Sequence, residues 1–316
     1  MTGALPDDFS RRLQEIVGPA STSAVVDSIT AQRPLAVRVH GDDAVVQSTF
    51  AELEAGGFHP VPVAWHRSAF LLLGGDRSTV QELDAYVEGR LWIQSLSSMA
   101  AVVALEVEPG HDVLDLCAAP GSKTSMLRAA QQGSGILVAN DRSRQRLFKL
   151  RATLERFGFD RIEITCGPGE AYGASHPGCF DRVLVDAPCS GEGMLHASDP
   201  AGLAQWSEGR IRRLARQQVG LLTAALRTLR PGGRCVYSTC TYAPEENELV
   251  VDRVLRRIGD GFELASLPDA MPGGMPGLVE WNGSPLDARL SRCLRLVPGM
   301  EPGLTGFFIA GIRRVS

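Results

Sequence analysis

The sequence predicts an α/β protein, in which a small α+β domain precedes a parallel sheet with helices on both faces. From residue 112 onward, short apolar runs alternate with longer segments of helical periodicity, and this alternation is typical of parallel sheets. Residues 1–90 differ in composition, since they carry seven Arg and no Lys against twelve acidic residues. We therefore expect an N-terminal domain at 1–90 and a larger domain at 91–316.

The overall composition is that of a soluble globular protein. Of the 316 residues, 44% are hydrophobic and 22% are charged, and both values are ordinary. No segment approaches the roughly 20 apolar residues of a membrane span, and the first nine residues carry acids where a secretory signal would be basic and apolar. We expect a cytoplasmic protein without membrane contact. The net charge of −4 argues against nucleic-acid binding by bulk electrostatics alone.

The seven cysteines form no CxxC pair and no cluster with histidine, so we expect no metal site. Free thiols are the expected state in a reducing compartment. Four cysteines lie in or beside apolar runs and are expected to be buried: Cys166, Cys179, Cys235 and Cys293.

The N-terminal domain is expected to contain two helices and then a β-α-β-β unit. The spacing of apolar residues predicts helices at 6–17 and 22–31, the first of them ending at Gly18-Pro19. Alternation and turn signals predict a strand at 35–39, a helix at 43–56, and strands at 61–65 and 70–73. This order suggests an RNA-recognition fold, but the acidity of the domain argues against a strong independent hold on RNA.

The remaining elements alternate along the chain. A bridging helix or an extended connector is expected at 79–93, and a helix at 92–106 is expected to lead into the larger domain. Strands are predicted at 112–117, 135–140, 162–166, 182–186 and 234–239, and a closing strand at 306–313. The predicted helices are 122–132, 143–157, 208–229 and 245–258. Residues 268–285, rich in Pro, Gly and Met, are expected to form an irregular loop.

An acid and a thiol follow one of these strands directly. The run 183–185 stops at Asp186-Ala187-Pro188-Cys189, because proline cannot donate to a sheet ladder. Asp186 and Cys189 therefore lie at the carboxyl edge of the sheet, where ligands bind in open parallel sheets. A flexible Ser-Gly-Glu-Gly segment comes next. The pattern indicates a reaction site.

Two further strand ends have the features of a cofactor site. The first runs into the small residues Cys117, Ala118, Ala119, Pro120, Gly121 and Ser122, and then Lys123. Backbone amides at this turn, with the lysine, would hold a carboxylate; the alternative is an ordinary turn with an exposed lysine. The next strand ends at Asp141, which is placed either to accept the hydroxyls of a ribose or to cap the following helix. Neither GxxxxGK[ST] nor GxGxxG is present, so the pair indicates S-adenosyl-L-methionine rather than NAD.

A second thiol occupies an equivalent position. The strand 234–239 leads into Cys240, and a helix is expected to start at Glu245. Cys240 therefore lies at the same sheet edge as Cys189, near a helix N-terminus that could lower the pKa of a thiol. The residues alone do not decide which cysteine attacks a substrate.

Three motifs, in this order, resemble the Sun/RsmB–RsmF (NOL1/NOP/Sun) family of RNA cytosine-C5 methyltransferases: 114–124, 186–193 and 237–241. The segments 92–99 and 306–310 are also similar to family segments, and the resemblance covers roughly 90–315. It implies a Rossmann-like sheet of the S-adenosylmethionine-dependent methyltransferases. Residues 1–90 look like the family's variable N-terminal region.

The resemblance also implies residue roles. Cys240 would add to C6 of the target cytosine, Cys189 would assist product release as a base or proton shuttle, and Asp186 would contact the N3/N4 edge of the base and lie beside the cofactor. The turn 117–123 would hold the cofactor, Asp141 its ribose, and Arg146 would lie in its neighbourhood.

One position departs from the family pattern. Family members usually carry an Asp after the third strand that contacts the adenine, whereas Pro168 lies near that position here. Either Glu170 or backbone groups would then contact the adenine, and we expect a weaker hold on it.

The expected partner is RNA, with ribosomal RNA first and tRNA second, because a base must leave its stack to reach such a pocket and single-stranded or looped RNA allows this. Two basic runs are candidate RNA contacts or solvated helix faces: Arg142, Arg144, Arg146, Lys149 and Arg151, and Arg210, Arg212, Arg213 and Arg216. We expect binding to need a partner protein or a ribosomal particle. The alternative function is a non-catalytic RNA-binding or ribosome-assembly factor that retains the fold.

Overall fold

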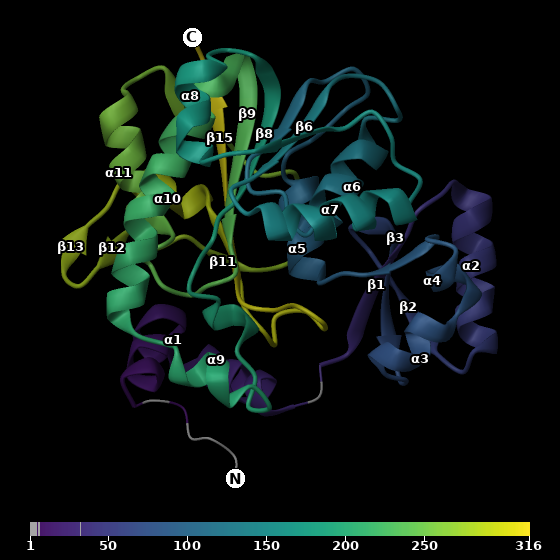
Figure 1. Cartoon of the computed structure of the whole chain (residues 1–316). Helices are drawn as coiled ribbons and strands as arrows, with labels where there is room; N and C mark the ends of the chain where they lie inside the picture. Colours follow the sequence, from purple (N-terminus) through teal and green to yellow (C-terminus); the bar gives the residue numbers. More distant parts are fainter. Residues whose placement is uncertain (1–4, 6, 32) are drawn as a thin grey trace.

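The computed structural model describes residue 5, residues 7–31 and residues 33–316. The expected absence of a secretory signal concerns residues that lie partly outside this range, as does the start of the helix expected at 6–17. A nine-stranded sheet forms the centre of the larger part of the molecule, and a four-stranded sheet forms the smaller part beside it (Figure 1).

Five parallel strands form the core of the large sheet, and antiparallel strands extend it at one edge. The parallel strands are β5 (Val113–Asp115), β6 (Leu137–Asp141), β7 (Glu163–Cys166), β8 (Phe180–Asp186) and β9 (Leu229–Thr239), in the order β7-β6-β5-β8-β9. β15 (Phe307–Arg314) pairs antiparallel with β9, and β10 (Phe262–Leu264), β14 (Leu294–Leu296) and β11 (Met275–Pro276) continue that edge. The sheet is therefore mixed rather than all parallel.

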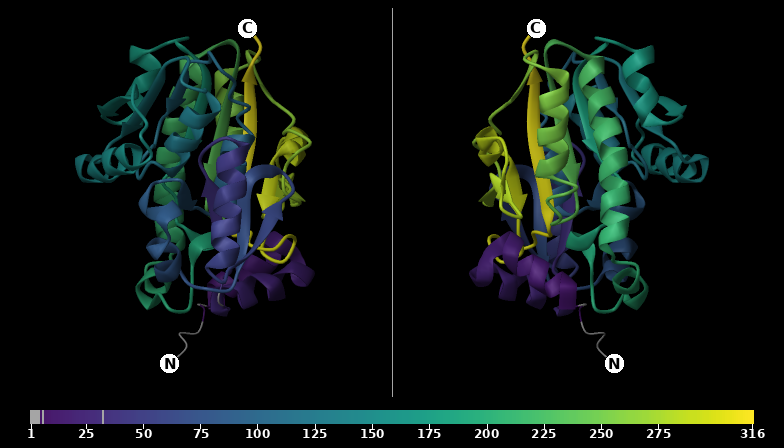
Figure 2. Two further views of the ribbon diagram at one scale, coloured as in Figure 1. Left: turned by 90° about the vertical axis from the view of Figure 1, so that its right-hand side faces the viewer. Right: turned by 90° about the vertical axis from the view of Figure 1, so that its left-hand side faces the viewer.

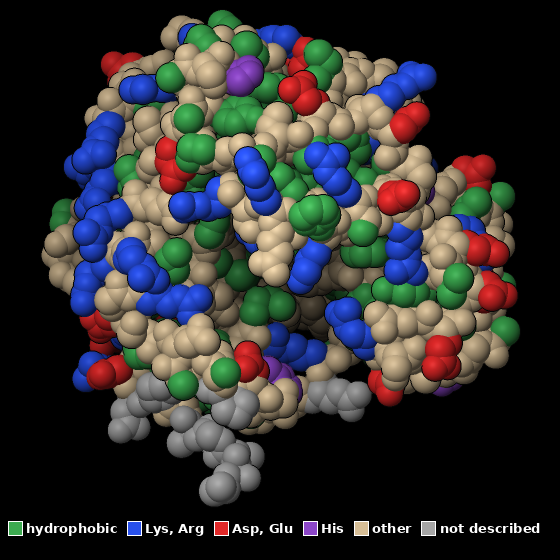
Figure 3. Space-filling view, viewed as in Figure 1, with side chains coloured by type: hydrophobic (Ala, Val, Ile, Leu, Met, Phe, Trp, Pro, Cys, Tyr) green, Lys and Arg blue, Asp and Glu red, His purple; other side chains and the backbone are tan. Residues whose placement is uncertain are grey.

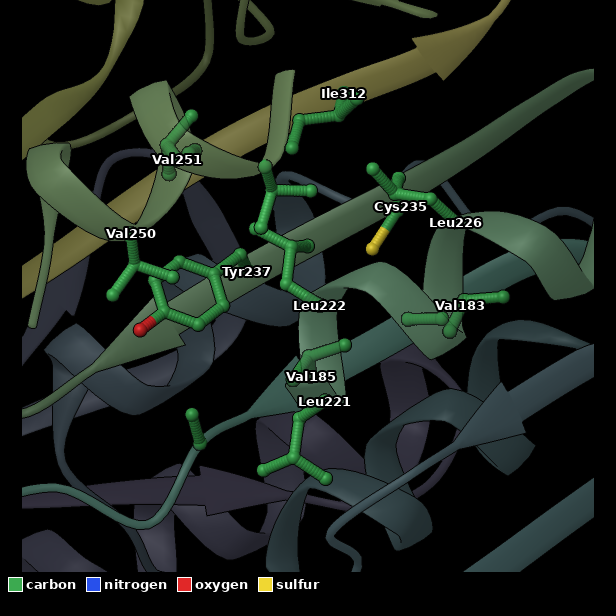
Figure 4. Close-up of a cluster of buried hydrophobic side chains, with 14 of the residues drawn as sticks. Val183, Val185, Leu221, Leu222, Leu226, Cys235, Tyr237, Val250, Val251 and Ile312 are labelled. Carbon is green, nitrogen blue, oxygen red and sulfur yellow. The ribbon is translucent and has the colours of Figure 1, made fainter. Parts of the chain in front are cut away.

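Helices cover both faces of the large sheet. α5 (Leu96–Val103), α6 (Ser122–Ala130) and α7 (Arg144–Arg156) cover one face, while α8 (Tyr172–Ser175), α10 (Glu208–Thr228) and α11 (Glu248–Ile258) cover the other. Successive strand residues alternate between the two cores, as the two-residue period of a strand requires. Val183 and Val185 pack with Leu222 of α10 (Figure 4), whereas Leu184 packs with Leu127 of α6.

The smaller part is a four-stranded antiparallel sheet with the order β2-β3-β1-β4. Its elements are β1 (Leu35–Val39), α2 (Asp43–Ala55), β2 (His59–Val63), β3 (His66–Leu73), α3 (Arg77–Glu82), α4 (Asp84–Val87) and β4 (Leu91–Ile93). This β-α-β-β-α-β order is the ferredoxin-like arrangement. One sheet face packs on the helices through Val37, Phe70 and Leu53.

The opposite face of this small sheet is buried against the larger part. Ala36 and Leu71 lie in one core with Met99 of α5, and Arg38 donates a hydrogen bond of 2.8 Å to the Ser125 hydroxyl on α6. RNA-recognition modules use an open sheet face for base stacking. That face is covered here, so a direct role of this sheet face in stacking bases is disfavoured.

The expected division of the N-terminal segment into two helices at Gly18 is confirmed. The element α1 (Asp7–Thr30) consists of two helices joined at a break at Gly18, where φ is +75°. α1 packs on the larger part rather than on the small sheet, since Phe9 and Leu13 share a core with Tyr242 and Trp281. The views in Figure 2 place α1 at the end of the molecule opposite the C-terminus.

The segment 79–93, expected as one bridging helix or an extended connector, contains instead most of α3, then α4 and β4, and β4 pairs with β1. α1 precedes residue 90 but packs on the larger part, and β4 follows residue 90 but belongs to the small sheet. The domain division at residue 90 stays a prediction. The loop expected at 268–285 contains three short strands, β11, β12 (Glu280–Trp281) and β13 (Ser284–Pro285). The remaining elements are η1 (Gly169–Ala171), η2 (Glu192–Met194), α9 (Pro200–Ala204) and η3 (Ala288–Arg292). Within the described residues, no helix is long and apolar enough to cross a membrane.

Candidate active site

Cys189 and Cys240 lie together at the carboxyl ends of β8 and β9, and we call this edge of the sheet the reactive edge. These strands are neighbours, with Asp186 opposite Ser238, so the segments that follow them leave the sheet side by side. The Sγ atoms of Cys189 and Cys240 lie 3.3 Å apart, and the Cys240 backbone N–H donates to the Cys189 Sγ over 3.3 Å. β15 runs antiparallel to β9 and points toward the C-terminus at the top of Figure 1. The carboxyl ends of β8 and β9 therefore lie at the opposite end of the sheet, toward α1.

A buried glutamate holds the loop that carries Cys189. The Glu246 carboxylate accepts hydrogen bonds from the Ser190 backbone N–H (3.0 Å), the Ser190 hydroxyl and the Gln218 amide (2.9 Å). Gln218 also donates to the Pro188 carbonyl over 2.8 Å. Burial raises the pKa of Glu246 to about 7, and these hydrogen bonds oppose the rise.

A second glutamate joins the two loops. Glu192 accepts hydrogen bonds from the Thr241 hydroxyl (2.8 Å), the Tyr242 backbone N–H (3.1 Å) and the indole N–H of Trp206 (2.7 Å). Thr241 directly follows Cys240, and Glu192 lies three residues after Cys189. The separation of the two thiols is therefore set by a shared carboxylate.

The two cysteines differ in their surroundings. The hydrogen bond with the Cys240 thiol, together with burial, raises the pKa of Cys189 well above its usual range. α11 begins at Glu248, three residues later than predicted, so the buried turn at 241–247 separates Cys240 from the helix. The prediction that Cys240 lies near a helix N-terminus is therefore wrong, because this turn lies between them.

Asp186 lies beside the thiols in a salt bridge with Lys123. Its carboxylate accepts from the Lys123 Nζ at 2.8 Å and from the Ser238 hydroxyl at 3.0 Å. The Lys123 side chain is only 11% exposed, and its Nζ lies 5.7 Å from the centre of the Phe307 ring. The alternative of an exposed lysine on an ordinary turn is therefore wrong.

The turn at 117–122 leads into a helix, α6, whose N-terminus has no side-chain cap. Gly121 is the N-cap of α6, with φ of +111°. The first amides of α6 are therefore available to an anionic ligand. Just before it, Asp115 is fully buried, and within the described residues its Oδ1 has no hydrogen-bond partner. Burial raises the pKa of Asp115 to about 7, against a hydrogen bond from Thr124.

Asp141 organises the neighbouring strand end. Its two oxygens accept from the backbone N–H groups of Ala119 (3.3 Å) and Ser143 (2.9 Å). Arg146 reaches back from α7 to pair with Asp141 at 3.2 Å, and it also donates to the Ala119 carbonyl. The N-cap of α7 is Ser143, not Asp141, so the capping alternative for Asp141 is wrong.

A small cavity of about 20 Å³ opens between these strand ends, lined by Leu116, Asp141, Arg146, Glu170 and Pro188 among others. It is too small for a nucleoside, so side chains on its rim must move when such a ligand enters. The uncapped α6 amides, the Lys123 ammonium, the Asp141 carboxylate and the unpartnered Asp115 oxygen nevertheless fit the polar groups of S-adenosyl-L-methionine.

Sequence reasoning missed the supporting residues Asp115, Glu246, Gln218 and Glu192. Asp115 and Glu192 both lie inside the quoted motifs. An acid within an apolar strand was an available signal for Asp115, and an acid between two glycines was one for Glu192. Gln218 lies in the middle of a long helix, and nothing local distinguishes it. Of the cysteines expected to be buried, Cys235 and Cys293 are buried, Cys179 is partly buried and Cys166 is exposed. No group of metal-ligating side chains is found among the described residues.

Known structures confirm the class of protein. The chain superposes on a methyltransferase homolog protein from Pyrococcus horikoshii with a TM-score of 0.81 and 30% identity, covering 98% of this chain and 95% of that one. A structure of NSun6 from Pyrococcus horikoshii, solved with SFG, gives the same TM-score at 20% identity and covers 100% of both chains. The fold is thus the Rossmann-like fold of the S-adenosylmethionine-dependent methyltransferases.

The family follows from sequence comparison. Residues 102–313 match the family described as 16S rRNA methyltransferase RsmB/F. Ribosomal RNA small subunit methyltransferase F of Aeromonas hydrophila is 37% identical over 85% of this chain, and that of Cronobacter sakazakii is 34% identical over 99%. This chain belongs to the RsmB/F family. It spans 58% and 64% of the length of these two relatives.

Proposed function

We propose that this protein methylates C5 of a cytosine in RNA, with small-subunit ribosomal RNA as the first substrate and tRNA as the second. One observation carries the proposal: two thiols lie 3.3 Å apart at a sheet edge, beside a carboxylate paired with a lysine. C5 of cytosine is a poor nucleophile, and covalent addition at C6 divides one difficult step into two easier ones. The family and its named relatives support RNA as the substrate.

Cys240 is the proposed nucleophile. Its thiolate forms a bond to C6, and C5 becomes nucleophilic enough to take the methyl group. Loss of the C5 proton then allows the Cys240–C6 bond to break and restores the ring double bond. The assignment of the attack to Cys240 follows the family resemblance, and Cys189, with its Sγ 3.3 Å from that of Cys240, is placed to assist release as base or proton shuttle. Asp186 would contact the N3/N4 edge of the base.

S-adenosyl-L-methionine supplies an electrophilic methyl group when bound. The 117–122 turn, through the uncapped amides at the start of α6, and Lys123 would hold its carboxylate, and Asp141 would hold its ribose, with Arg146 beside it. The Pyrococcus horikoshii NSun6 structure contains SFG, an analogue of this cofactor. Pro168 is exposed and Glu170 lines the small cavity, so we keep the prediction of a weak adenine contact. We place the reaction in the cytoplasm, with a ribosomal particle or protein partner assisting RNA binding.

The test compares wild type, Cys240→Ala, Cys189→Ala and the control Cys179→Ala, whose thiol is remote from the edge. Each protein is incubated with labelled S-adenosyl-L-methionine and total RNA from cells lacking the gene. We expect no transfer by Cys240→Ala, a denaturation-resistant RNA adduct with Cys189→Ala, and full activity in the control. An adduct with Cys240→Ala instead would exchange the two roles. A folded wild type that binds cofactor but labels no RNA would favour the non-catalytic RNA-binding alternative.

A further inference from the structure

A cavity of about 560 Å³ lies where α1, the small sheet and the loop before β15 meet. We call it the junction pocket. Its lining comes from the end of α1 and the residue after it (24–31), from residues 33–36, from Arg77, from Ile93 at the end of β4 and the two residues after it, from Met194, and from the loop 298–305. Figure 3 shows the surface hollowed between the larger and smaller parts of the molecule. The proposed reaction assigns no role to this pocket.

The junction pocket adjoins the loops that carry the thiols. The Gly193 backbone N–H donates to the Cys240 carbonyl over 2.9 Å. Gly193 also packs against Gly306 so closely that a Cβ added to it would lie 1.9 Å from the Gly306 carbonyl oxygen. Met194 and Thr305, the chain neighbours of these two glycines, line the pocket. A molecule in the pocket therefore lies against the loop that follows Cys189, one residue from the contact of Gly193 with Cys240.

The pocket wall contains a buried amide without a partner. Gln94 is 5% exposed, and its Oε1 accepts from the Arg38 Nε at 3.2 Å. A guanidinium has only donors, so the oxygen faces Arg38 and the NH₂ group is turned away from it. Within the described part of the chain, the Gln94 Nε2 has no hydrogen-bond partner. A buried donor of this kind is costly unless a ligand accepts from it.

The remaining lining favours a ligand without net charge that has apolar surface. Arg33 and Arg77 are matched by Asp27 and Glu301, so the formal charges cancel and a phosphate is disfavoured. The larger apolar lining residues include Leu35, Ile93, Met194, Pro298, Pro302 and Leu304. The volume lies within the range of roughly 300–1,000 Å³ typical of ligand sites. A nucleobase combines apolar faces with hydrogen-bond acceptors on its edge.

We propose that the junction pocket receives the unpaired base of an RNA nucleotide adjacent to the target cytosine, with the Gln94 amide donating to an acceptor on its edge. This proposal rests on the proposed function. Enzymes that act on an extruded base select their substrates through the flanking nucleotides, and unpaired bases are recognised on their hydrogen-bonding edges. The pocket then determines sequence context, while the thiols perform the reaction.

The first arm of the test uses wild-type protein alone. The methylated cytosine is mapped, and transcripts are assembled by ligation with an abasic residue at the preceding or the following position. We expect kcat/KM to fall at least about tenfold for one of the two positions, which is the size of effect associated with losing one stacked base. Equal activity on both abasic RNAs and the intact RNA overturns the proposal.

The second arm uses variants of the lining. Ala31→Trp, at an exposed position beside the pocket, fills the cavity from outside. It should lower kcat/KM on intact RNA about tenfold and abolish the sensitivity to the abasic residue. Gln94→Glu keeps the oxygen that accepts from Arg38 and removes the NH₂ donor. It should raise KM for RNA at least about fivefold, with kcat and cofactor affinity within twofold of wild type. Arg67→Ala, an exposed arginine on the same small sheet, is the control.

Two failures are distinguishable. The pocket proposal alone is overturned if wild type methylates the intact RNA and both abasic RNAs with equal kcat/KM. It is also overturned if the Ala31→Trp protein is as active as wild type. A wild-type protein that methylates no RNA overturns the proposed function as well. Thermal unfolding of each variant separates loss of binding from loss of folding.

Discussion

At the scale of single residues, buried carboxyl groups support the reactive edge. Asp115 lies just before the 117–122 turn and accepts a hydrogen bond from Thr124, and Glu246 holds the Cys189 loop. Burial raises the pKa of each to about 7. A carboxyl group whose pKa is higher in the folded than in the unfolded state binds its proton more tightly when folded. Its contribution to stability is complete below the unfolded pKa, near 4, and is lost as the pH rises through about 7.

This linkage predicts that the free energy of unfolding falls as the pH rises from 5 to 8. Each such group contributes at most about 1.4 kcal/mol per pH unit between its two pKa values. Glu246→Gln removes one titrating group and should flatten the slope, as measured by urea unfolding at several pH values. Glu280→Gln, at an exposed position, is the control. An unchanged slope in Glu246→Gln would mean that Glu246 titrates normally in the folded protein.

At the scale of elements, the short segment after β8 is held by contacts with two other parts of the large sheet. It packs against the start of β15 through Gly193 and is tied to Thr241 through Glu192. Two strands that are distant in sequence therefore position one loop. The close approach at Gly193 leaves no room for a side chain, whereas Gly191, in the same loop, has φ of +80° and open space around it.

These two glycines provide a matched comparison. Gly193→Ala should destabilise the protein by about 3 kcal/mol or more, because its Cβ meets backbone that cannot move cheaply. Gly191→Ala carries only the backbone strain of a positive φ and should cost about 1 kcal/mol. Chemical denaturation measures both values, and methyl transfer should fall further in Gly193→Ala. Equal costs would show that β15 yields easily at Gly306.

The boundaries of elements were predicted well where local signals dominate and poorly where tertiary contacts decide. Strand 35–39 was predicted with its observed bounds, because alternation and flanking turns define it. Residues 91–93 were not predicted as a strand, since their partner β1 lies over fifty residues earlier. α11 begins late because Asn247 binds the Thr241 carbonyl and the Thr239 hydroxyl. Such contacts are invisible to local periodicity.

At the scale of the whole molecule, a nearly neutral chain presents basic surfaces. Lys and Arg side chains gather over α7 and α10 in Figure 3. On α7, Arg144, Lys149 and Arg151 are exposed, and between them Phe148 is 73% exposed. Cationic side chains around an exposed aromatic ring are typical of surfaces that bind single-stranded nucleic acid.

The α7 surface predicts salt-dependent RNA binding. Replacing Lys149 and Arg151 together by Ala should reduce the slope of log K against log salt by about 1.4, since each phosphate contact on single strands contributes roughly 0.7. RNA affinity measured from 50 to 300 mM salt checks this value. Arg11→Ala, which removes an exposed arginine paired with Asp8, should leave the slope unchanged. Similar slopes in all three proteins would assign the α7 cations to a solvated face.

The sequence by itself determined the α/β class and brought Asp186, Cys189 and Cys240 to one sheet edge. It could do so because strands, turns and strand ends are set by short-range patterns, and parallel topology brings carboxyl ends together. The tertiary structure decided the 3.3 Å approach of the thiols and the burial of Glu246. It also decided which face of the small sheet is covered, and the cavity beside Gln94. These features depend on side chains from distant segments packing together, and no local pattern encodes that packing.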